Sequence, residues 1–346
     1  MQNAALKNER KIWIDVAKGL GMILVVIGHS RPPEWLKEVI FSFHMPLFFF
    51  LSGLVYKAKS TSVSIKRRIM KDGKSLVIPY VITVFVIGVF LLVIQAQGRK
   101  GYYDSLLDLG RSALFGSGAN YNEIKMIGEI WFLLAMFWSR RFMDGVYSFN
   151  SAYIRPVLVA IGVALSIVLA SKRIWLATNI DIAFIALLFM YCGSLLQKKE
   201  ELINNYFFLC LMIFVYYLAH HYSRLEMDNR NYYHLWFLSL PGAIAMSIIV
   251  SKISMVLSKI KGVCSFLAYV GKHSLLFLCI HSLDWRMPFP KIGQSFINSF
   301  SSSSRYWIIS SIHRFCFDFL VMVIILGALY ICQQLPKRTQ FDGKQR

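Results

Sequence analysis

The sequence predicts an all-α, polytopic integral membrane protein with about ten transmembrane helices. Of its 346 residues, 56% are hydrophobic and only 16% are charged, whereas about a quarter of the residues of a soluble domain are charged. Long apolar runs recur along the chain, each near the ~20 residues that cross a bilayer core. The net charge of +20 does not indicate a nucleic-acid partner, because the basic residues lie in short connections where membrane orientation explains them.

The ten predicted spans follow the apolar runs in chain order. They are 12–30, 39–56, 76–95, 124–142, 153–170, 178–197, 206–220, 233–251, 263–283 and 305–333. No linker, soluble domain or internal repeat interrupts these runs. The sequence therefore predicts one membrane-embedded domain over residues 1–346, with its core at about 10–333 and a basic tail at 334–346.

Lysine and arginine in the connections predict the orientation of the chain. About 21 of them lie in the two tails and in the connections after even-numbered spans, against about 9 on the other side, and such residues mark the cytoplasmic face. Both termini are therefore predicted to be cytoplasmic. The connection 57–74 alone holds seven of these residues. We interpret it mainly as an orientation signal, with attraction of the phosphates of a nucleotide or an anionic lipid as the alternative.

Ionisable side chains inside the predicted spans are the main functional signal. An Asp, Lys or Arg at the centre of a span costs about 2.5–3.5 kcal/mol if it faces lipid, so these groups are expected to face the bundle interior or a watered cavity. Asp15 and Lys18 are placed near the cytoplasm and Lys272 about mid-depth. The alternating directions of the spans place a further set in one layer near the outer face: His29, His44, Glu129, Asp181, His281, His313 and Arg314.

The first span carries three of these groups on one stripe. Lys18 and His29 are eleven residues apart, which is about three helical turns and a rise of ~16 Å. Asp15 lies three residues before Lys18 and so shares this face. A cation near the cytoplasm and a titratable base near the far side suit an elongated anionic ligand whose reactive end lies deep in the membrane.

Small and aromatic residues of the second span favour a packing role. Ser52 and Gly53 are interpreted as a close-packing site between helices rather than as a nucleophile. The run Phe48 to Phe50 is interpreted as packing rather than as a platform for a sugar.

Five segments of the sequence carry recognisable motifs. The opening "RKIWIDVAKGLGMILVVIGHS" has a basic residue (Arg10 or Lys11), then D-x-x-(R/K)-G, then a histidine eleven residues after the Arg or Lys. The other segments are "FSFHMPLFFFLSGLVY", "EIWFLLAMF", "IDIAFIALLFMYCGSLL" and "VGKHSLLFLCIH", and together the five cover about residues 10–283. In this order they resemble the acyltransferase 3 family, the integral-membrane acyltransferases of bacterial surface sugars. The chain has Lys18 where many members have arginine, which keeps the charge but loses the bidentate fork.

This resemblance implies an O-acyltransferase of the bacterial inner membrane. The implied donor is acetyl-CoA or another acyl-CoA, with succinyl as an alternative acyl group, and the implied acceptor is a sugar hydroxyl of a lipid-linked or surface glycan. His29 is the expected general base, with an acyl-histidine relay as an alternative. No metal and no permanently bound cofactor is expected. The residues expected to bind the donor are Arg10, Lys11, Asp15, Lys18 and Lys272, and those expected to bind the acceptor or support the site are His44, Glu129, Asp181, His281 and Arg314.

Two alternatives remain open at this stage. Glu129 and Asp181 are interpreted either as groups that bind the acceptor hydroxyls or, equally, as structural partners of Arg314 or Lys272. The whole chain could instead be a transporter or flippase of a glycan lipid, which would also bury polar groups at mid-depth. Neither an internal repeat nor a pair of broken helices in corresponding halves is evident in the sequence. Acyl transfer by purified protein in detergent separates the enzyme from the transporter.

Overall fold

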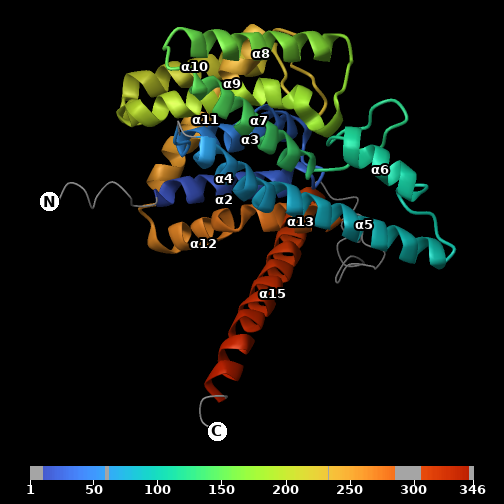
Figure 1. Cartoon of the computed structure of the whole chain (residues 1–346). Coiled ribbons are helices and arrows are strands. Elements are labelled where there is room, and N and C mark those ends of the chain that lie inside the picture. The colour runs from blue at the N-terminus through green and yellow to red at the C-terminus, as the bar shows by residue number, and fades with distance from the viewer. Residues whose placement is uncertain (1–10, 59–61, 233, 285–304, 343–346) are drawn as a thin grey trace.

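The structure is a computed structural model that describes residues 11–58, 62–232, 234–284 and 305–342. These residues form helices and connections, with no strand among them. Figure 1 shows the helices, which are α2 (Ile12–Gly28), α3 (Glu34–Leu54), α4 (Ser62–Asp72), η2 (Gly73–Val77), α5 (Ile78–Ala96), α6 (Leu106–Phe115), α7 (Trp131–Ser148), α8 (Ile154–Ser171), η3 (Ala177–Asn179), α9 (Ile180–Leu196), η4 (Gln197–Asn204), α10 (Tyr206–Tyr222), α11 (Trp236–Leu257), α12 (Lys261–Lys272), α13 (Ser274–Asp284) and α15 (Tyr306–Asp342).

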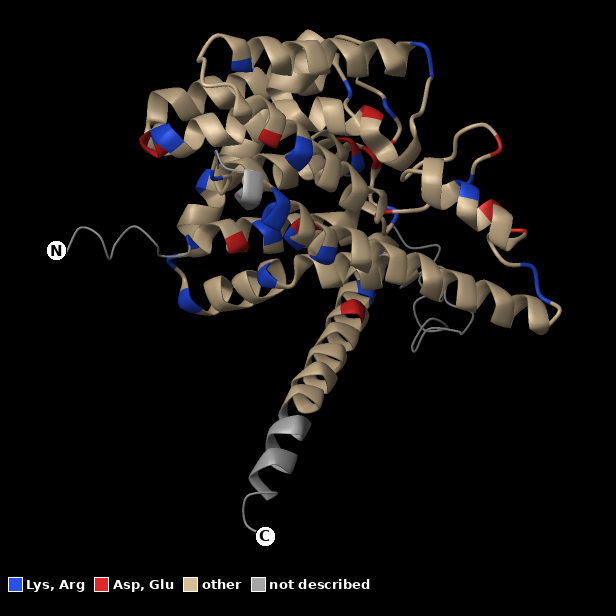
Figure 2. Cartoon of the chain, in the orientation of Figure 1, with Lys and Arg blue, Asp and Glu red and all other residues tan. Residues whose placement is uncertain are grey.

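The helices pack in successive layers. α8 and α10 cover α9 and α11, which pack on α3 and α7, and α2 lies between α3 and α12 (Figure 1). The inner helices α3 and α9 carry many of the most buried side chains, whereas α15 projects from the bundle (Figure 1). Between Tyr306 and Gln333, α15 is apolar apart from Arg314 and Asp318, which lie near the end that joins the bundle (Figure 2).

The predicted all-helical membrane class is confirmed, but the count of ten spans is not. Six helices within the described residues are long and apolar enough to cross a membrane, or seven if α12 and α13 count as one bent span. α10 is an apolar helix of 17 residues, short of the ~20 residues that a span requires. The count of ten and the cytoplasmic placement of both termini therefore stay predictions.

Three predicted spans have different limits in the structure. The span 263–283 is bent by 69° between α12 and α13, because His273 leaves the helical region with φ −107° and ψ 16°. α7 begins only at Trp131, after Gly128 with φ 76°, a conformation that glycine adopts without steric cost. α15 continues to Asp342, into the predicted tail. The helices α4 and α6 were not predicted, since both lie in connections between apolar runs.

Glycines let the backbones of two helix pairs touch. A Cβ added to Gly53 would lie 2.0 Å from the carbonyl oxygen of Met190, and one added to Gly193 would lie 2.1 Å from that of Phe50. α3 and α9 therefore meet backbone to backbone, and the close-packing prediction for Gly53 is confirmed. A Cβ on Gly271 would lie 1.8 Å from the carbonyl oxygen of Asp15, so α12 lies equally close to α2.

The connections gather at two ends of the bundle. The histidine end holds the connections 29–33, 97–130, 172–179 and 223–232, and these touch one another, as when the Asn179 amide donates to the Gly116 carbonyl oxygen at 3.2 Å. The basic end holds residues 55–58, 65–77 and 197–204. It is tied together by contacts such as that of the Arg140 guanidinium with Asp72 at 2.7 Å. The two ends carry different candidate sites.

Candidate active site

His29 ends α2 at the histidine end of the bundle. Its backbone N–H donates to the carbonyl oxygen of Val25 at 3.1 Å, and its own carbonyl oxygen accepts from the Arg314 guanidinium at 2.6 Å. About a quarter of its side chain, 26%, is exposed. The residue is therefore fixed through its backbone by two helices far apart in the sequence, while its ring remains accessible.

A buried carboxylate faces the His29 ring. Nδ1 of His29 lies 3.5 Å from Oε1 of Glu129. The other carboxylate oxygen of Glu129 accepts a hydrogen bond from the Ser282 hydroxyl at 2.9 Å. Glu129 is 5% exposed and lies in the turn before α7 rather than inside a helix. The packed turn and Ser282 together hold this carboxylate against the histidine.

Two further histidines complete the cluster. The His281 ring centre lies 5.8 Å from that of His29, and its Nδ1 pairs with Oδ2 of Asp318 at 2.7 Å in a fully buried contact. His44 is buried, and its Nδ1 lies 2.8 Å from the Ile40 carbonyl oxygen. Asp318 thus orients the His281 ring, and the Ile40 carbonyl oxygen orients the His44 ring.

A small cavity lies among these side chains. Its volume is about 10 Å³, close to the space that one water molecule needs. The lining residues are His29, Phe41, His44, Met45, Gly118, Glu129, Trp131, Met227 and Asp228. The structure thus brings His29, His44 and Glu129 to one cavity and places His281 and Arg314 against His29. Their catalytic and binding roles stay predictions.

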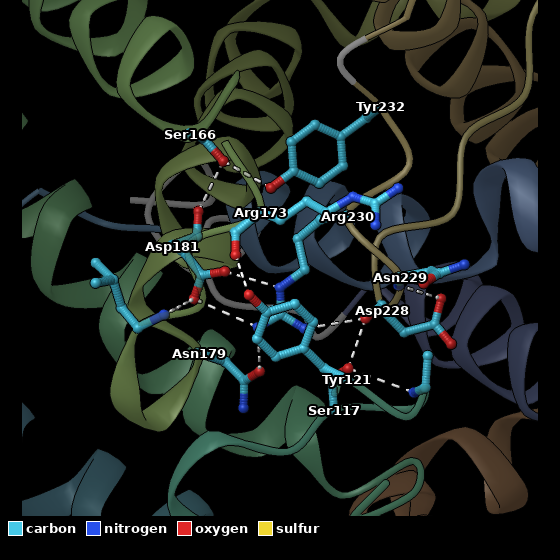
Figure 3. A network of polar contacts seen from close by, with 12 residues as sticks. Ser117, Tyr121, Ser166, Arg173, Asn179, Asp181, Asp228, Asn229, Arg230 and Tyr232 are labelled. Atoms are coloured by element: carbon cyan, nitrogen blue, oxygen red, sulfur yellow. Dashed lines mark hydrogen bonds and ion pairs between the residues drawn. The ribbon is translucent and has the colours of Figure 1, made fainter. Parts of the chain in front are cut away.

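Asp181 lies apart from this cluster and has a different partner from those considered in the sequence. Its carboxylate accepts from Nε of Arg230 at 2.8 Å, and the two side chains are 1% and 2% exposed. Asn179 Oδ1 accepts from the same guanidinium at 3.1 Å (Figure 3). Sequence reasoning missed Arg230. One feature of the sequence could have indicated it: Arg230 lies in a connection on the predicted outer side, where few lysines and arginines are expected.

The predicted donor-binding residues are not gathered at one point. Lys18 Nζ lies 3.7 Å from the buried carboxylate of Asp15, and Lys11 pairs with Glu200. Lys272 is exposed at the bend between α12 and α13. Arg10 lies outside the described residues. Asp15 and Lys18 share one face of α2, and this cation is already paired along the helix. His29 follows the last helical residue, Gly28, so the common stripe of all three stays a prediction.

A larger cavity, of about 480 Å³, lies at the basic end. Its lining residues are Ser52, Val55, Tyr56, Lys57, Arg67, Arg68, Lys71, Asp72, Ser75 and Arg140. Five of these ten are cations and one is an anion. Asp72 is held by both Arg140 and Arg141, and Arg68 is paired with Asp144. The paired groups form the walls, and the exposed Lys57, Arg67 and Lys71 are the cations nearest to solvent.

Comparison with known proteins identifies the family. A family model described as an acyltransferase domain, that of acyltransferase 3, matches residues 11–333. The chain belongs to the acyltransferase 3 family. The match extends into α15 as far as residue 333, whereas the motifs at about 10–283 did not reach this helix. No curated protein and no solved structure matches the chain. Together with the apolar helices, the family makes this a multi-pass membrane acyltransferase.

Proposed function

We propose that this acyltransferase 3 protein moves an acyl group, in the first place acetyl, from an acyl-CoA to a sugar hydroxyl of a surface or lipid-linked glycan. The observation that carries the proposal is the contact of His29 with the buried carboxylate of Glu129 at the wall of a cavity. An accessible imidazole backed by a carboxylate is the arrangement of a general base. The family match supplies the class of reaction.

The proposed chemistry uses the two nitrogens of His29 differently. Glu129 lies beside Nδ1 and favours the neutral tautomer of His29 whose ring proton is on Nδ1. In that tautomer Nε2 can accept a proton. Nε2 takes the proton of the acceptor hydroxyl as its oxygen attacks the thioester carbonyl. The C–S bond then breaks, and the imidazolium returns the proton to the departing thiolate. Glu129 stabilises the imidazolium during this step, and Ser282 keeps Glu129 in place.

The basic cavity is the proposed site for the phosphates of the donor. Its volume of about 480 Å³ lies within the usual range of ligand pockets, and arginine and lysine are the residues that bind phosphate. Ser52 at this cavity and His44 at the other are eight residues apart on α3, a rise of about 12 Å. A thioester on a long arm therefore has a short distance to cover between the two cavities.

The orientation that fits this assignment has the basic end in the cytoplasm of a bacterium, where acyl-CoA is made. The lysine and arginine count in the connections supports it. The histidine end then faces the outer side of the inner membrane, where the glycan acceptor approaches. Both termini are cytoplasmic in this proposal.

Replacing two exposed cations of the basic cavity tests the donor site. Arg67→Gln and Lys71→Gln should each raise the KM for acetyl-CoA about tenfold, because each removes one charged hydrogen bond to phosphate. Lys66→Gln is the matched control, since Lys66 is exposed on the same helix but does not line the cavity. The KM for the glycan should not change in any variant. Equal donor KM values for Lys71→Gln and Lys66→Gln would contradict the assignment.

One observation favours the transporter as a second candidate. The bent pair of α12 and α13 is a broken helix, and broken helices form the substrate sites of many transporters. The bend lies beside Lys272, one of the ionisable groups inside the predicted spans. Transfer of an acyl group by protein in detergent separates the two functions, because a transporter needs two compartments.

A further inference from the structure

Two connections at the histidine end each contribute to two neighbouring cavities. The connection after α6 gives Gly118 to the small cavity beside His29 and residues 120–122 to a second cavity. The connection after α10 gives Met227 and Asp228 to the first and residues 229–231 to the second. The two connections touch where the Ser117 hydroxyl donates to the Asp228 carbonyl oxygen at 2.5 Å. The second cavity therefore adjoins the proposed reaction site.

The second cavity is polar and large enough for a ligand. Its volume is about 350 Å³, within the usual range for small-molecule sites. Four of its nine lining residues are asparagines, and the full lining is Asn120, Tyr121, Asn122, Ala170, Arg173, Trp175, Asn229, Arg230 and Asn231. An asparagine offers one acceptor oxygen and two donor hydrogens, and the hydroxyls of a sugar both donate and accept. The lining therefore has the chemistry of a saccharide site.

The wall of this cavity is an aromatic stack held in place by a buried arginine. The Trp175 ring stacks on Tyr121 at a centroid distance of 4.3 Å, and the Arg230 guanidinium lies 3.5 Å from the centre of the Trp175 ring. Arg230 is in turn held by Asp181 and Asn179 (Figure 3). The Tyr121 hydroxyl donates to the Arg173 carbonyl oxygen. Three connections are thus locked together around one aromatic stack, which gives the cavity a fixed shape.

Several polar groups of the lining are available to a ligand. The side-chain amides of Asn122 and Asn231 and the guanidinium of Arg173 form no hydrogen bond or ion pair with any residue that the structure describes. Arg173 and Asn122 are exposed, and Asn231 is half-buried. Such groups pair with water until a ligand replaces it.

We propose that this cavity is a saccharide subsite, which binds the sugar next to the one that is acylated. The proposal rests on the proposed function, because it requires the glycan to approach the histidine end. Binding two sugars at once would orient the reacting hydroxyl toward His29, since the two connections that line the subsite also line the small cavity. The Asp181–Arg230 pair is then a positioning element: it does not touch the reacting groups but holds the wall of the subsite.

The test compares acceptors of different length. Surface polysaccharide from a strain that lacks this protein is freed of its esters by mild alkali, cut by partial acid hydrolysis, and separated into monosaccharides and trisaccharides. Transfer from radiolabelled acetyl-CoA to each fraction is then measured with purified protein in detergent. The wild type should use the trisaccharides with at least about tenfold higher kcat/KM, as two or more added hydrogen bonds would give.

The variants are Asn231→Leu and Arg173→Ala, with Asn150→Leu as the control because Asn150 is exposed on the connection between α7 and α8. Both subsite variants should raise the KM for trisaccharides about threefold to tenfold and leave monosaccharide transfer and acetyl-CoA hydrolysis unchanged. A trisaccharide preference that persists in both variants, or that is absent from the wild type, overturns the subsite and leaves the acyltransferase standing. Failure of the wild type to transfer acetyl to any fraction overturns the proposed function and the subsite with it.

Discussion

His29→Ala is expected to lower acyl transfer about 10²–10⁴-fold, the range that a general base contributes. The variant keeps the backbone carbonyl that accepts from Arg314, so α2 and α15 should stay joined. Transfer from radiolabelled acetyl-CoA to alkali-treated surface polysaccharide measures the effect, and the thermal unfolding midpoint in detergent shows whether the variant is folded.

The control for this change is another histidine at the same end. His221 lies in the last turn of α10 and is exposed, so His221→Ala should keep full activity. Glu129→Gln should lie between the two, because it keeps a partner for Nδ1 but removes the charge that stabilises the imidazolium. A well-folded His29→Ala protein with activity near that of His221→Ala would show that the base is another residue.

Arg230→Gln is expected to cost about 3–5 kcal/mol of stability, since it leaves the carboxylate of Asp181 buried without its charge partner. The double variant Asp181→Asn/Arg230→Gln should be more stable than Arg230→Gln alone, because it removes the uncompensated charge. Thermal or urea unfolding in detergent measures both differences.

An exposed arginine at the same end provides the comparison. Arg224 pairs with Glu38 at 2.5 Å, but its side chain is 66% exposed, so Arg224→Gln should change stability by no more than about 1 kcal/mol. Equal stability of Arg230→Gln and Arg224→Gln would mean that the Asp181–Arg230 pair does not hold the three connections together.

The helical elements were largely predictable because burial in a bilayer imposes one simple pattern. Every predicted apolar run contains a helix in the structure. The cluster around His29 was also predictable, because ionisable groups from separate spans were placed at one depth and must avoid lipid. Glu129 lies beside His29 although it precedes its helix, since the turn at Gly128 keeps it at the same end of the bundle.

The contacts between connections were not predictable from the sequence. Arg230 meets Asp181 across 49 residues of chain, and neither apolar periodicity nor a motif links them. The basic cavity combines α4 with Arg140 of α7, which meets Asp72 across 68 residues. The same seven cations in the connection 57–74 could be counted in the sequence, but only the fold shows that several of them line one cavity.

Acyl transfer by the purified protein alone distinguishes the acyltransferase from the transporter. Purified wild type in detergent is incubated with acetyl-CoA labelled in the acetyl group and with alkali-treated surface polysaccharide. We expect label on the polysaccharide in alkali-labile ester linkage, and at least about a hundredfold less label with His29→Ala. Unlabelled polysaccharide after incubation with folded wild type, together with movement of a glycan lipid across the membrane of vesicles that contain the protein, would exclude the proposed acyl transfer and support the transporter.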